Sequence, residues 1–212
     1  MLLSSYTMSE RTSDNRLALI EAALTSIAEI GLIRTSVTEI IDRAGLSRGM
    51  IHLHFGGKDA LIIAAAEHAN AQYYQILERD MAAAPDGAAA RIAAMIHSDL
   101  SAETLNPRSV AIWYELRGAA RTNATIAAYS DTRDIRLRRV MEAAFSGVSP
   151  AGTPQSLAQE AAIATISMVE GMWTDYMLHP ENFDRAFAAR IVFRMLSSLF
   201  PDAFDLNGAR GL

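Results

Sequence analysis

Cysteine is absent from this chain of 212 residues, lysine occurs once, and no long apolar run is present. Without thiols the protein has neither disulfides nor thiolate metal sites. No apolar stretch approaches the ~20 residues that a helix needs to span a bilayer. The first residues lack the basic segment and long apolar core of a signal peptide. We therefore expect a cytoplasmic protein with no membrane segment.

The residues that are abundant favour helices. Half of the chain is hydrophobic, with much alanine and leucine, and aromatic residues make up only 7%. Alanine, leucine and methionine are strong helix formers. The formal net charge of −5 excludes a surface that is basic throughout. It leaves room for a small basic face, because salt screens charges beyond about 10 Å at 0.1 M.

Apolar residues recur at helical spacing, and capping residues and glycines divide the chain into about nine helices. No strand is expected, so the predicted fold class is all-α. Residues 147–154, GVSPAGTP, have the composition of a linker. The expected helices cover about 14–30, 37–44, 47–55, 58–84, 88–102, 107–120, 123–145, 155–178 and 182–199.

Two of these helices, 37–44 and 47–55, are very short and are separated by Gly45. Helices of this length are unstable alone and must pack on the first helix. Two short helices joined by a tight turn indicate a helix-turn-helix, with 47–55 as the candidate reading helix. Gly49 would let a neighbouring backbone approach closely. On spacing alone, an ordinary three-helix corner with a solvated face fits equally well.

The run TSVTEIIDRAGLSRGMIHLHFGGKDAL at 35–61 resembles the DNA-binding domain of the tetracycline-repressor (TetR) family. Gly31 matches the glycine that usually closes the first helix of that domain. The resemblance implies three DNA-binding helices, a fourth linking helix, and a remainder that binds a ligand and dimerises. The implied organisation is a mobile arm at 1–13, a DNA-binding domain at 14–57 with its helix-turn-helix at 36–55, a ligand-binding and dimerisation domain at 58–204, and a flexible tail at 205–212.

The resemblance also implies which residues contact DNA. Hydroxyls at the helix starts would meet phosphates, residues along the reading helix would face base edges, and the lone lysine would hold a phosphate at the start of the fourth helix. His52 takes the place usually held by a tyrosine that contacts the backbone. The expected set is Thr35, Ser36, Ser47, Arg48, Gly49, Met50, His52, Leu53, His54 and Lys58.

Residues 106–129 and 170–201 resemble one branch of the family, the choline-responsive BetI-like repressors. A bundle of this kind can enclose an apolar cavity with a few polar groups. Arg117 and Glu170 would pair in the empty protein, and Trp113, Trp173 and Tyr176 could form an aromatic cage for a quaternary ammonium. For any single residue the alternative is ordinary core packing. The candidate ligand-binding set is Met95, Trp113, Tyr114, Arg117, Met168, Glu170, Met172, Trp173 and Tyr176.

The last two helices carry apolar stripes suited to a four-helix dimer interface. The alternative is that both stripes are buried against their own chain. A dimer could read half-sites about 34–36 Å apart, or a multiple of that spacing. The candidate interface residues are Leu157, Ala161, Ala164, Thr165, Met168, Phe183, Phe187, Ile191, Met195 and Leu199.

The function that we expect is a homodimeric transcriptional regulator, a repressor that binds a palindromic operator and is released by a small molecule. The alternative is a helical ligand-binding or adaptor protein without sequence-specific DNA binding. No metal-ligand cluster, nucleophile elbow or phosphate loop is present, so we expect no enzyme activity, no catalytic residue and no cofactor. The effector, the operator sequence and the regulated genes do not follow from the sequence.

Overall fold

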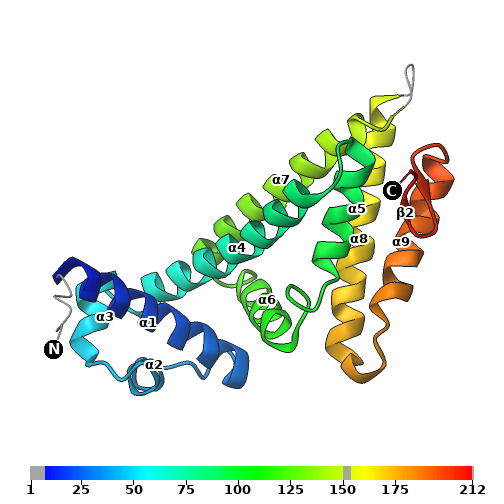
Figure 1. Ribbon diagram of the computed structural model, residues 1–212. Coiled ribbons are helices and arrows are strands. Elements are labelled where there is room, and N and C mark those ends of the chain that lie inside the picture. The colour runs from blue at the N-terminus through cyan, green and yellow to red at the C-terminus, as the bar shows by residue number, and fades with distance from the viewer. Residues whose placement is uncertain (1–7, 150–153, 212) are drawn as a thin grey trace, which may run out of the picture. The chain divides into compact units, whose positions relative to one another are not determined.

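The computed structural model describes residues 8–149 and 154–211, and most of them are helical (Figure 1). This confirms the all-α fold class. The elements are α1 (Met8–Ile30), α2 (Val37–Ala44), α3 (Arg48–Phe55), α4 (Lys58–Ala83), α5 (Ala88–Asp99), α6 (Pro107–Ala119), α7 (Ala124–Ser146), α8 (Gln155–Leu178), the 3₁₀ turn η1 (Pro180–Asn182), α9 (Arg185–Leu199), and the two-residue strands β1 (Phe204–Asp205) and β2 (Gly208–Ala209).

The chain divides into two compact units, and the division does not fall where the domain boundary was predicted. The first unit comprises the residues up to Ala71 together with Ala111–Tyr129. The second comprises Gln72–Val110 and the residues from Ser130 onward. The first part of α4 and most of α6 therefore form one compact unit with the three N-terminal helices, and the functional boundary at residues 57 and 58 stays a prediction.

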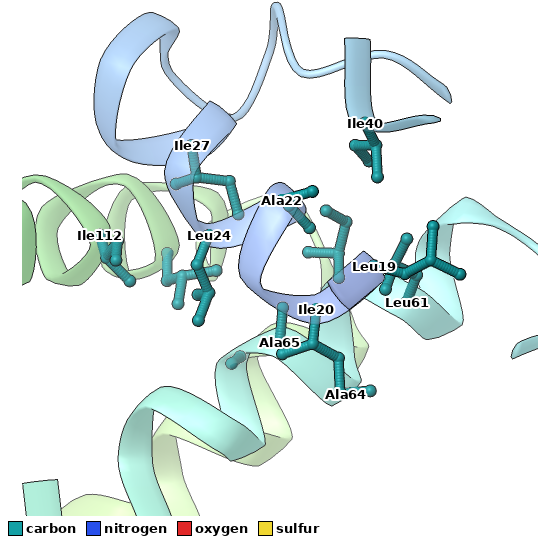
Figure 2. Packing of buried hydrophobic residues seen from close by; sticks show 14 of the residues in the cluster. Leu19, Ile20, Ala22, Leu24, Ile27, Ile40, Leu61, Ala64, Ala65 and Ile112 are labelled. Carbon is teal, nitrogen blue, oxygen red and sulfur yellow. The ribbon is translucent and has the colours of Figure 1, made fainter. Parts of the chain in front are cut away.

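The core of the first unit joins the apolar face of α1 to side chains from five other helices. Leu19, Leu24 and Ile27 are almost completely buried. They belong to one cluster with side chains of α2, α3, α4, α6 and the start of α7, and Figure 2 shows α1 residues directed at the alanines of α4. Burying one such leucine or isoleucine contributes about 1.5–3 kcal/mol. This cluster is what stabilises the eight-residue helices α2 and α3. The main contributors outside α1 are Ile40, Ile51, Leu61, Ala65 and Ile112.

The second unit has an aromatic core near the C-terminal end of α9. The rings of Phe145 and Phe200 stack with centroids 5.7 Å apart, and those of Phe193 and Phe204 with centroids 6.4 Å apart. Phe204 is fully buried and belongs to β1, which pairs antiparallel with β2. The prediction of no strand is therefore wrong for this segment, and the predicted tail at 205–212 contains part of a short hairpin in its described residues. The sequence does not indicate this hairpin because each of its strands is only two residues long.

The start of the chain also differs from the prediction. Residues 8–13 are the first turns of α1, and Asp14 lies inside the helix rather than at its N-cap. Residues 1–7 of the predicted arm and 150–153 of the predicted linker lie outside the described residues.

Candidate nucleic-acid interface and effector-binding residues

The helix-turn-helix is built by local capping that the sequence encodes. The Ser36 hydroxyl accepts a hydrogen bond from the Glu39 amide at 3.1 Å, which caps α2. Gly45 ends α2 with φ at 65°, in the left-handed region that favours glycine. Gly56 ends α3 in the same way, with φ at 77°. The two caps fix the length of each helix and the turn between them.

One face of α3 is turned to solvent and carries most of the residues predicted to contact DNA. Arg48, Gly49, His52 and Leu53 are exposed, and Leu53 is 74% exposed. Ser47 is also exposed and stands at the N-cap position of α3, yet its side chain makes no capping hydrogen bond. Its hydroxyl can therefore serve an external acceptor such as a phosphate oxygen.

Two cations lie at the edges of this face. The Arg48 guanidinium donates to the Thr38 hydroxyl over 3.3 Å, longer than the about 2.7–2.9 Å of a strong charge-assisted bond. Lys58, partly buried, is the first residue of α4, where the helix dipole disfavours a cation unless an anion is close.

Three residues of the predicted set are placed differently. Thr35 is fully buried, and its hydroxyl donates to the carbonyl of Gly31 at 2.9 Å, so this hydroxyl is turned away from solvent and its phosphate contact stays a prediction. Met50 packs against the core cluster of the first unit. The Nε2 atom of His54 is buried and lacks a hydrogen-bond partner among the described residues. Periodicity could not separate these inward positions from the outward ones, because a short helix has few residues on each face.

The predicted ligand-binding residues are distributed over both units. Trp113, Tyr114 and Arg117 of α6 lie in the first unit, while Met95 and Glu170 lie in the second. Arg117 is exposed, and its guanidinium carbon lies 5.2 Å from the centroid of the Trp113 ring. Four residues of the predicted set lie on α8 and are half-buried: Met168, Glu170, Met172 and Tyr176.

In the second unit, a carboxylate that the sequence did not single out joins three helices. Asp99 of α5 accepts a hydrogen bond from the Trp173 indole nitrogen at 3.1 Å and another from the Tyr73 hydroxyl at 3.0 Å. Trp173 is 7% exposed. The cluster fixes α4, α5 and α8 around one acidic group. Tyr176 is placed elsewhere, with the Arg185 guanidinium carbon 5.2 Å from its ring centroid.

The candidate dimer residues divide by helix. In α9, Phe187 and Leu199 are exposed and Ile191 and Met195 are partly so, and their four-residue spacing puts them on one face. We call these four residues the α9 stripe. In α8, Ala161 is fully buried in its own chain and Thr165 is 1% exposed, so neither has surface to offer a partner. The exposed apolar residue of that part of α8 is Ile163 instead.

Two further searches bear on other kinds of site. Among residues 8–149 and 154–211, no group of three or more histidine, aspartate or glutamate side chains could hold a metal ion. None of the helices in this part of the chain is long and apolar enough to cross a bilayer.

An exposed reading helix in an all-helical chain defines a DNA-binding regulator of the helix-turn-helix class. Residues 19–65 match the family of bacterial regulatory proteins of the tetR type, and residues 82–201 match the C-terminal domain of BetI-type transcriptional repressors. The second match covers more than half of the chain. The protein belongs to the TetR family of transcriptional regulators, with a BetI-type C-terminal domain.

Individual relatives agree with this assignment. The HTH-type transcriptional regulator BetI of Burkholderia mallei is 27% identical over 176 residues, which cover 83% of this chain and 88% of the relative. A transcriptional regulator from Pseudomonas aeruginosa PAO1 has a TM-score of 0.79 at 26% identity, covering 94% of this chain and 95% of that one. A regulator from Saccharomonospora viridis, solved with choline, has a TM-score of 0.75 at 16% identity, covering 87% and 96%, which supports the fold alone.

Proposed function

We propose that the chain forms a homodimer in the cytoplasm that binds a palindromic operator through α3 and the start of α4 and represses transcription until a small molecule releases it. The observation that carries the proposal is the exposed face of α3, where Ser47, Arg48, Gly49 and His52 lie without a covering element of their own unit. An exposed polar face next to an exposed leucine suits a groove that offers both phosphates and thymine methyl groups.

The α9 stripe supports the dimer. Phe187 is 57% exposed and Leu199 is 38% exposed, which is a large apolar surface to leave in water. A single helix-turn-helix contacts few base pairs, whereas two related by a two-fold axis read two half-sites at once. We expect the stripes of two copies to pack on each other.

In our proposal the effector is contacted in one of two places, either by residues of α6 in the first unit or by the Asp99 cluster in the second unit. A carboxylate that accepts hydrogen bonds from an indole and a phenol is acidic and aromatic in its surroundings, which suits a cationic ligand. Choline is a suitable first probe because the Saccharomonospora viridis regulator was solved with it. Binding would change the fluorescence of Trp173, and Asp99→Asn should weaken that change, while the exposed control Glu181→Gln should not.

A gel shift with DNA from upstream of the protein's own gene tests the proposal. We expect retarded bands that weaken as salt rises, since released counterions drive binding to phosphates. A chain that remains monomeric and prefers that DNA no more than a random duplex would contradict it, and would favour a helical adaptor or ligand carrier.

A further inference from the structure

One glutamate of α6 contacts the loop between α1 and α2, far away in sequence. The Leu32 amide donates a hydrogen bond of 2.7 Å to Oε2 of Glu115, across a separation of 83 residues. The bond is partly buried and its acceptor is charged, so it is among the stronger hydrogen bonds of the first unit. Glu115 thus reaches the backbone that leads into the helix-turn-helix.

Gly31 provides the space for this carboxylate. It ends α1 with φ at 82°, and its amide bonds to the carbonyl of Ile27 at 3.0 Å. A Cβ added at Gly31 would lie 3.2 Å from Oε1 of Glu115, closer than ordinary van der Waals contact. The glycine therefore serves two requirements, the left-handed backbone and the close approach of Glu115.

The same loop connects directly to the start of α2. The Thr35 hydroxyl and the Thr35 amide both donate to the Gly31 carbonyl, at 2.9 and 3.1 Å. The next residue is Ser36, whose hydroxyl caps α2. The loop from Gly31 to Ser36 is therefore short and internally bonded, and a displacement at Leu32 has to be accommodated at the first turn of α2.

An ion-pair link holds the other end of α2 to α1. Arg43 lies 2.7 Å from a carboxylate oxygen of Glu29 and 2.9 Å from one of Glu39. Hydrogen bonding to Glu39, and then to Glu29, raises the pKa of the Arg43 guanidinium above its usual value. These ion pairs link α2 to the end of α1. The Glu115 carboxylate, in contrast, comes from α6, so a movement of α6 can separate it from the Leu32 amide.

We propose that Glu115 is a positioning residue that couples the state of α6 to the orientation of the helix-turn-helix. This inference rests on the proposed function. Trp113 lies two residues before Glu115 on α6, and Arg117 lies two residues after it. A ligand that contacts either residue and shifts α6 also moves the Glu115 carboxylate away from the Leu32 amide. The loop then loses its acceptor, and the first turn of α2 loses the position that places α3 on DNA.

The test uses reciprocity. If α6 and the helix-turn-helix are coupled, DNA binding must alter α6 just as a shift of α6 alters DNA binding. Hydrogen exchange is measured residue by residue for the full chain, free and bound to a duplex from its own upstream region. In the wild-type protein we expect the duplex to slow exchange at the Leu32 amide and throughout the last two turns of α6.

Three variants of Glu115 distinguish a coupling of α6 to the helix-turn-helix from a hydrogen bond that only stabilises the loop. Glu115→Ala removes the acceptor and should speed exchange at Leu32 by about tenfold and abolish the DNA-induced change in α6. Glu115→Gln keeps an acceptor oxygen and should restore most of that change. Glu115→Asp keeps the charge but shortens the reach by one methylene, and should behave like the alanine variant. Glu67→Ala, which removes an exposed glutamate of α4 in the same unit, should leave the exchange unchanged.

The outcomes distinguish the inference from the proposed function. A wild-type chain that does not bind the duplex overturns both. A wild-type chain that binds it, with the same DNA-induced change in α6 persisting in Glu115→Ala and Glu115→Asp, overturns the coupling role of Glu115 alone. If the alanine variant does not fold, the glutamine and aspartate variants still decide the question, because they differ in reach and in charge.

Discussion

Replacing Gly49 by alanine should have opposite effects on the fold and on operator binding. Gly49 is the second residue of α3, has no positive φ, and a Cβ at this position would meet only Oγ of Ser47, at 3.9 Å. The free protein therefore has room for the methyl group. Because glycine in a helix costs about 0.5–1 kcal/mol relative to alanine, Gly49→Ala should raise the free energy of unfolding by up to that amount. The melting temperature should rise by roughly 2–4 °C per kcal/mol.

On DNA the same methyl group would occupy the surface that faces the duplex. Overpacking a close contact costs about 1–3 kcal/mol. With 1.4 kcal/mol for each factor of ten, the dissociation constant should rise by about 5- to 150-fold. Thermal denaturation and fluorescence anisotropy with a labelled upstream duplex measure the two effects separately. Gly171→Ala is the matched control, since this exposed glycine of α8 has no positive φ and no atom within 4 Å of an added Cβ. It should stabilise the fold and leave DNA affinity unchanged. If Gly49→Ala binds the duplex as tightly as the wild type, α3 does not approach a backbone at Gly49, and our assignment of this face fails.

The remaining predictions concern the cations, the dimer, the core and acid pH. Lys58→Ala should weaken operator binding and lower the slope of log K against log salt by about one, measured by anisotropy, whereas Arg138→Ala on α7 should change neither. Phe187→Asp should shift the protein from dimer to monomer in sedimentation, unlike Leu206→Asp on the hairpin turn; a monomeric wild type would refute this. Phe193→Ala should lower the free energy of unfolding by about 3–5 kcal/mol in denaturant titrations, because Phe193 is fully buried, whereas a similar loss in Phe187→Ala without dissociation would contradict the burial argument. Hydrogen bonds from Arg79 lower the pKa of Glu103 below 4.5, so the pair's contribution is present above the unfolded pKa of 4.5 and is lost as pH falls through the lower folded value. The difference in melting temperature between the wild type and Glu103→Gln should be small at pH 7, because the side chains of Arg79 and Glu103 are both exposed. The difference should vanish on acidification.

The sequence was informative where a structural feature depends on neighbouring residues. Gly45 was predicted from its local context as the turn between two short helices, and the structure places it there, at the C-cap of α2 with φ at 65°. Such predictions succeed because a turn of this kind needs only one residue that adopts a left-handed backbone readily.

Features that depend on distant residues were not predictable in this way. The roles of Glu115 and Asp99 require helices brought together across 83 and 74 residues, respectively. The C-terminal hairpin was missed because its stability comes from burying Phe204, a tertiary contact, and not from strand propensity.

The position of Lys58 has a practical consequence. It is the only lysine in the chain, and it stands on the first turn of α4 beside the reading helix. Amine-directed reagents would therefore modify one side chain at the proposed operator surface, apart from any free amino terminus. Acetylating Lys58 would remove its positive charge while leaving every other side chain as it was. The extent to which bound duplex shields this amine from a succinimidyl ester would then map occupancy of the surface without any engineered label.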